Sequence, residues 1–146
     1  MIRGGIGDWR LAALGLLAAF AIMLAGLGWD GLGDDEAWTA WAVRSPYVMD
    51  TLMHVRDDGQ PPLYFLLLDG WTLAVGESVF ALRLPSVWYA LVGLAAVYAL
   101  GARLFDRLTG MYALALLATA SLCVYYVREA RMYSLLLLLA VLATWA

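Results

Sequence analysis

The chain has 146 residues, of which 64% are hydrophobic and only 14% are charged. About a quarter of the residues in a soluble domain are charged, so this composition excludes an ordinary soluble protein and indicates several membrane helices. The net charge of −3 says little because the distribution of charge matters more, but the chain shows no basic nucleic-acid surface. The single cysteine, Cys123, excludes an internal disulfide.

The first long apolar run extends from Leu11 to Gly28 and is flanked by Trp9 and Trp29. It is long enough to cross a bilayer as a helix, and aromatic residues are common at both interfaces of such helices. The run is too long for the core of a signal peptide and is followed by no small-residue cleavage site. We therefore expect a retained transmembrane helix at about residues 10–29.

Residues 30–80 form the first loop, in which we expect short amphipathic helices that lie on the membrane surface. Asp34 is placed to cap the first helix, and the second is expected at Tyr47–Val55. Each has apolar residues at helical spacing on one face, namely Trp38, Trp41 and Ala42 in the first and Val48, Leu52 and Val55 in the second.

The stretch Pro61–Gly76 leaves two topologies open. It is only just long enough to cross a bilayer, and Asp69 in its middle disfavours crossing by roughly 2–4 kcal/mol. If it lies in the interface, the acidic loop 30–60 and the segment Arg128–Arg131 share one side, and Arg103–Arg107 is on the other. The positive-inside rule then makes the side of Arg103–Arg107 cytoplasmic. If the stretch crosses, Arg103–Arg107 becomes external, so we prefer the interfacial placement.

Further apolar runs predict helices at 84–102, 111–127 and 132–146. The expected fold is therefore an all-α polytopic membrane protein with three full transmembrane helices and a truncated fourth. Because the last run stops in mid-span, we expect residues 1–146 to be the N-terminal part of a longer transmembrane domain and to be inactive alone.

The cluster Asp34-Asp35-Glu36 directly follows the first helix. One acidic residue is enough to stabilise a helix N-terminus, and three consecutive acids exceed that need. A carboxylate beside the membrane is suited to be a general base for an acceptor hydroxyl, or a metal ligand. Capping and catalysis both remain open for this cluster.

The segment Arg128-Glu129-Ala130-Arg131-Met132-Tyr133 carries two arginines three residues apart. On a helix they would form a forked donor pair suited to phosphate, with Glu129 and Tyr133 on one face. Alternatively, the arginines extend to the interface from a helix end and Glu129 neutralises them. Elsewhere, Arg83 is expected to anchor a helix at the interface, and Asp69 is a candidate partner for it.

In chain order, these motifs resemble the N-terminal part of the integral-membrane GT-C glycosyltransferases. The nearest group is the protein-mannosyltransferase-like family 39, which includes the aminoarabinose transferases of lipid A. The resemblance rests on the ordered series Asp35-Glu36, Pro61-Pro62-Leu63-Tyr64, Glu77-Ser78, Ala81-Leu82-Arg83-Leu84-Pro85-Ser86 and Glu129-Ala130-Arg131-Met132-Tyr133.

The resemblance implies an inverting transfer from a polyprenyl-phosphate sugar to a hydroxyl of a lipid, glycan or protein acceptor, on the outer face of the cell membrane. It also implies that no metal is required. The positive-inside rule separately places the N-terminus of this multi-pass chain on the cytoplasmic side, with Arg103–Arg107. Asp35 would be the general base, with Glu36 beside it. The donor phosphate would lie near Arg128, Arg131, Glu129, Tyr133 and Gln60. Relatives often have His or Lys where this chain has Gln60.

Two other classes of protein are considered. A transporter needs polar residues along its helices, and the runs Leu11–Gly28 and Leu84–Ala102 contain almost none. A small structural membrane protein, or a pseudo-enzyme left by truncation, would fit the abrupt end of the last apolar run and stays open beside the enzyme.

Overall fold

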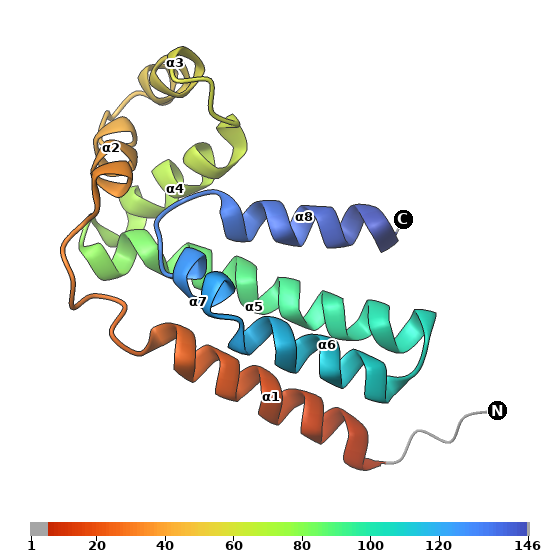
Figure 1. Ribbon diagram of the computed structural model, residues 1–146. Helices are drawn as coiled ribbons and strands as arrows, with labels where there is room; N and C mark the ends of the chain where they lie inside the picture. Colours follow the sequence, from red (N-terminus) through yellow and green to blue (C-terminus); the bar gives the residue numbers. More distant parts are fainter. Residues whose placement is uncertain (1–5, 146) are drawn as a thin grey trace.

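The computed structural model describes residues 6–145, which form eight α-helices and no β-strand (Figure 1). In chain order they are α1 (Ile6–Leu24), α2 (Asp34–Ala42), α3 (Val48–Asp57), α4 (Pro62–Val75), α5 (Val79–Leu104), α6 (Arg107–Thr119), α7 (Ser121–Val127) and α8 (Tyr133–Trp145). The all-α prediction is confirmed for these residues.

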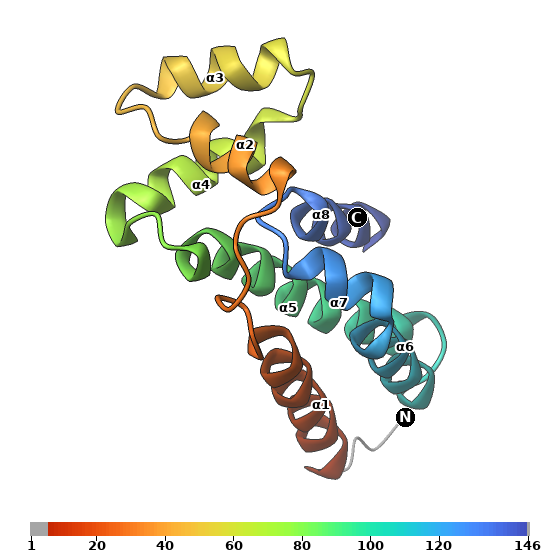
Figure 2. The same cartoon turned by 60° about the vertical axis from the view of Figure 1, so that its left-hand side comes forward.

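Helix α5 is the centre of the bundle, and α1, α6 and α8 pack along it. Helices α2, α3 and α4 gather at one end, where α3 lies across the direction of the bundle (Figures 1 and 2). The loop that joins α7 to α8 is at this same end, and the turn that joins α5 to α6 is at the other. The bundle therefore brings the residues around 35 and 130 together.

The number of long membrane helices is smaller than predicted. Within residues 6–145, length and composition give one candidate span, α5, or two if α6 and α7 are counted as one span bent by 64°. Helix α1 ends at Leu24, before Gly26 adopts a φ of 77°. The expected helix at 111–127 is broken at Ala120, whose ψ of 119° is extended. Average hydropathy is the same for a broken and a straight apolar segment, so the sequence did not reveal these breaks.

The loop helices form near their predicted positions but with different details. Gly33, not Asp34, is the N-cap residue of α2, and the Glu36 side chain accepts a hydrogen bond from its amide. Trp41 is 55% exposed and stacks on His54 with ring centroids 4.2 Å apart. The buried residues of α2 are Glu36, Thr39, Ala40 and Ala42, and those of α3 are Thr51 and Val55. Of the predicted apolar faces, Ala42 and Val55 are therefore the buried members.

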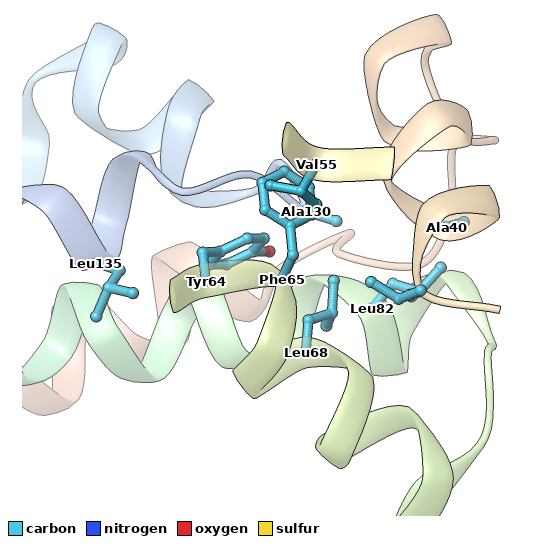
Figure 3. Close-up of a cluster of buried hydrophobic side chains, with 9 residues drawn as sticks. Ala40, Val55, Tyr64, Phe65, Leu68, Leu82, Ala130 and Leu135 are labelled. Carbon is cyan, nitrogen blue, oxygen red and sulfur yellow. The ribbon is translucent and has the colours of Figure 1, made fainter. Parts of the chain in front are cut away.

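Helix α4 is packed into the protein through one face. Phe65 and Leu68 of α4 join Val55 of α3, Leu82 of α5 and Ala130 in one apolar cluster (Figure 3). Asp69 is also buried on α4, and it does not pair with Arg83, which instead binds Glu36. The α4 helix is therefore fixed to α3 and α5 by side-chain packing.

Helices α5 and α6 approach so closely that a glycine is required between them. A Cβ atom added to Gly110 would lie 2.5 Å from the carbonyl oxygen of Tyr98 and 3.0 Å from the amide nitrogen of Ala102. Both atoms belong to the backbone and cannot move aside separately. Any larger residue at 110 would push α6 away from α5.

A proline inside α5 creates the hydrogen bond that ties α4 to it. Pro85 has no N–H, so the carbonyl four residues earlier, that of Ala81, has no helical donor. The indole Nε1 of Trp71 donates to this oxygen at 2.9 Å. The Trp71 side chain of α4 thus replaces the missing backbone donor of α5.

Helix α5 begins at Val79, before the predicted residue 84, because the Ser78 hydroxyl caps it by accepting from the Ala81 amide at 3.2 Å.

We expect Trp71→Phe to destabilise the fold by about 1–3 kcal/mol, because the Ala81 carbonyl would be left without a donor. Thermal unfolding in detergent measures this loss. Trp88→Phe is the matched control, since the Trp88 ring packs edge-on against Trp71 at 4.9 Å but its indole makes no hydrogen bond within residues 6–145. An equal loss in both variants would show that ring packing, and not the hydrogen bond, joins α4 to α5.

Candidate active site

The Glu36 carboxylate is buried and accepts four hydrogen bonds. Its Oε1 accepts from Arg83 Nε at 2.9 Å and from the Ala130 amide at 2.8 Å. Its Oε2 accepts from Arg83 Nη2 at 2.7 Å and from the Gly33 amide at 3.1 Å. A carboxylate has about four acceptor positions, so Glu36 is fully occupied.

Arg83 is enclosed by the segment that joins α1 to α2. Besides its two bonds to Glu36, its Nη1 donates to the carbonyls of Leu27 at 2.8 Å and Asp30 at 3.3 Å. Its Nη2 also donates to the carbonyl of Gly31 at 3.0 Å. The prediction that Arg83 is an interfacial anchor is therefore wrong, because the side chain is buried and binds three backbone carbonyls and a carboxylate.

The environment of Glu36 favours its ionised form. Burial by itself raises the pKa of this carboxyl group, but the hydrogen bonds from Arg83, Ala130 and Gly33 outweigh it and hold the pKa below the usual 4.5. An ionised carboxylate with every acceptor position filled cannot readily take a proton from a substrate. Its geometry is that of a group that holds α2, α5 and the α7–α8 loop together.

Asp35, the neighbouring residue, has the opposite environment. Its side chain is 77% exposed, and its Oδ2 lies 3.9 Å from Nη2 of Arg131. The Asp35 carbonyl also accepts from Arg131 Nη1 at 3.4 Å. The fold thus brings together two predicted site residues that are far apart in sequence, and leaves the Asp35 carboxylate accessible.

Arg131 is buried but has few partners. Only 8% of its side chain is exposed, and its Nε has no hydrogen-bond partner among the described residues. Its contacts to Asp35 are long for a charged pair. A buried guanidinium with unused donors is suited to bind an additional anion.

The predicted pairing of Arg128 with Arg131 is not formed. Helix α7 ends at Val127 and α8 begins at Tyr133, so residues 128–132 are a loop and helical spacing does not apply to them. Arg128 Nη2 donates to the carbonyl of Ile22 in α1 at 2.6 Å. The two arginines therefore contact different parts of the fold.

Arg128 lines a cavity of about 590 Å³ between the end of α1, the α6–α7 break and the α1–α2 segment. Glu129, Asp30, Ser121 and Tyr125 line it as well, and the Glu36–Arg83 pair forms one wall. Its size is in the range of pockets that hold small molecules. Glu129 thus belongs with Arg128 at this cavity.

Gln60 and Tyr133 lie apart from these groups. Gln60 Nε2 donates to Asp58 Oδ2 at 3.0 Å. The Tyr133 ring packs against Tyr126 with centroids 4.6 Å apart and lines a smaller apolar pocket. The hydrogen bonds and ring contacts of residues 6–145 do not connect either residue to Asp35. Within that range, no group of three or more His, Cys, Asp or Glu side chains is arranged to hold a metal ion.

Residues 59–146 match the model of the dolichyl-phosphate-mannose-protein mannosyltransferase family. The chain belongs to this family. The match confirms the resemblance found in the motifs and indicates a membrane glycosyltransferase in general. The family as a whole implies a lipid-linked sugar donor and a glycan or protein acceptor. No curated protein and no solved structure matches this chain. Arg83, Arg128 and Arg131 lie inside the matched segment, and Asp35 and Glu36 precede it.

We expect Glu36→Gln to lower stability by about 3–5 kcal/mol, because Arg83 would be left as a buried charge without its counterion. The loss is measured as a lower thermal midpoint of unfolding in detergent. Glu77→Gln is the matched control, because Glu77 forms an exposed pair with Arg44 at 2.9 Å and its loss should cost at most about 1 kcal/mol. If both variants unfold at the same temperature, the Glu36 pair does not hold the fold together.

Proposed function

We propose that this chain supplies the catalytic base and a donor-phosphate contact of an inverting glycosyltransferase that uses a polyprenyl-phosphate sugar. The observation that carries the proposal is the accessible Asp35 carboxylate beside buried Arg131, whose guanidinium has unused donors. The acceptor is a hydroxyl group of a lipid, glycan or protein.

In this mechanism, Asp35 accepts the proton of the acceptor hydroxyl. The acceptor oxygen forms a bond to the anomeric carbon of the sugar while the bond from that carbon to the phosphate oxygen breaks. The bonding electrons leave with the phosphate, and the single displacement inverts the anomeric centre. Exposure of Asp35 supports this role, since an acceptor can reach its carboxylate from solution.

Arg131 would stabilise the negative charge that develops on the departing phosphate. Its Nη2, whose contact to Asp35 Oδ2 is 3.9 Å long, makes no hydrogen bond among the described residues and supports such a contact. Arg128 and Glu129 would contribute through the cavity of about 590 Å³, with Arg128 adding positive charge. Contacts of Gln60 and Tyr133 to the donor remain a prediction, because the hydrogen bonds and ring contacts of residues 6–145 do not connect either residue to Asp35. The proposed chemistry uses no metal.

Glu36 takes a different role in this proposal from that of its neighbour. Its four acceptor positions are filled, so we assign it as a positioning residue for α2, which carries Asp35. The side chains of Asp35 and Glu36 diverge because successive residues of a helix are about 100° apart. One therefore faces the acceptor side and the other faces Arg83.

We expect Asp35→Asn to lower kcat by about 10²–10⁴-fold, because an amide cannot take the acceptor proton. The assay follows transfer of radiolabelled sugar from a panel of polyprenyl-phosphate sugars to membrane acceptors by the natural full-length protein. Asp34→Asn is the matched control, as Asp34 is also exposed in the first turn of α2. Undiminished transfer by Asp35→Asn would exclude Asp35 as the base.

We also propose that the end of the bundle with Asp35 and Arg131 faces the outside of the cell membrane. The acidic character of residues 30–60 and the arginines at 103 and 107 support this orientation.

A single cysteine at Met49, in a Cys123→Ser background, should react with a membrane-impermeant maleimide in intact cells. One at Phe105 should react only after permeabilisation. Both positions are exposed in the structure, so accessibility is matched. The reverse pattern would place the site on the cytoplasmic side.

A further inference from the structure

Two buried hydroxyl groups connect the motifs Gln60–Tyr64 and Ala81–Ser86 to the loop that carries Arg131. The Tyr64 hydroxyl of α4 and the Ser86 hydroxyl of α5 are 3.2 Å apart. Ser86 Oγ donates to the backbone carbonyl of Arg131 at 3.3 Å. The chain of contacts thus runs from α4 through α5 to the residue that faces Asp35.

The direction of these hydrogen bonds follows from the number of protons. A serine hydroxyl has one proton, and that of Ser86 is used by the Arg131 carbonyl, which can only accept. The Tyr64 hydroxyl must therefore donate to Ser86 Oγ. Each of the two hydroxyl groups is then satisfied in this arrangement.

The backbone around Arg131 is held from two sides. The preceding amide, that of Ala130, donates to Glu36 Oε1 at 2.8 Å, and the Arg131 carbonyl accepts from Ser86. Among residues 6–145, the guanidinium makes only long contacts to Asp35, and its buried Nε has no partner. Arg131 is thus fixed by its main chain, and its side chain keeps donors for a ligand.

The two hydroxyl groups are not needed to fill space. Ser86 is fully buried, where an alanine would pack and a hydroxyl without a partner would be unfavourable. The Tyr64 ring packs edge-on against Phe65 and Tyr89, contacts that a phenylalanine would also make. What the hydroxyl groups add is the link to the Arg131 carbonyl.

We propose that Tyr64 and Ser86 are positioning residues that hold the main chain of Arg131, so that its guanidinium faces Asp35 with donors free for the leaving phosphate. The proposal rests on the proposed function, since it assumes that Arg131 acts on the donor. It gives the Pro-Pro-Leu-Tyr and Leu-Pro-Ser motifs a shared role that neither motif shows alone.

The test uses the natural full-length protein in proteoliposomes, with kcat and KM measured for each variant. We expect Ser86→Ala to lower kcat by about tenfold, the effect of losing the hydrogen bond to the Arg131 carbonyl, with little change in the acceptor KM. Tyr64→Phe should lower kcat less, and Ser86→Thr, which keeps the hydroxyl, should restore most of it. Ser134→Ala is the matched control, because Ser134 is a buried serine whose hydroxyl has no partner in the described residues.

A double-mutant cycle separates positioning from general stability. If Ser86 acts through Arg131, Ser86→Ala should cause no further loss of kcat in an Arg131→Ala background. An unchanged kcat for Ser86→Ala, or the same tenfold loss in both backgrounds, would overturn the proposal. If Ser86→Ala does not fold, Tyr64→Phe carries the same cycle, since its ring packing is kept.

The cycle also distinguishes this proposal from the proposed function. Full activity of Arg131→Ala would overturn the role of Arg131 on the donor and, with it, the positioning role. A large loss in Arg131→Ala together with normal activity in Ser86→Ala and Tyr64→Phe would overturn the positioning role only.

Discussion

The buried ion pair between Glu36 and Arg83 is the interaction on which the arrangement of this end of the bundle depends. It joins α2, the α1–α2 segment, α5 and the α7–α8 loop through hydrogen bonds to one carboxylate and one guanidinium. Such a pair adds little net stability compared with an apolar core, but removal of one partner leaves a costly buried charge. The pair therefore selects one arrangement of these segments over others.

Asp35 and Glu36 show how adjacent residues of one type are given different tasks. The helical rotation between them turns Glu36 inward to Arg83, where its acceptor positions are filled, and leaves Asp35 exposed beside Arg131. A base needs a free, accessible carboxylate, and a structural ion pair needs a saturated, buried one. With two adjacent acids, the Glu36 carboxylate can support the structure while the neighbouring Asp35 carboxylate stays free to react.

Much of the helical architecture could be predicted, because apolar runs and capping residues are local signals. The runs around α1, α5 and α8 and the two loop helices were expected near their observed positions. The break at Ala120 and the end of α1 before Gly26 were not. Hydropathy reports how apolar a segment is and not whether its backbone is continuous, so these breaks had no signal.

The sequence by itself determined the helical class, the order of the motifs and the family, because these depend on composition and on residue types along one chain. It also singled out Asp35 and Arg131. Only the tertiary structure decided that Arg83 pairs with Glu36 rather than Asp69, that Arg128 and Arg131 separate, and that Ser86 binds the backbone of Arg131. These are contacts between segments far apart in the chain, and the packing of α2, α4 and the α7–α8 loop against α5 selects among partners that the sequence leaves equally possible.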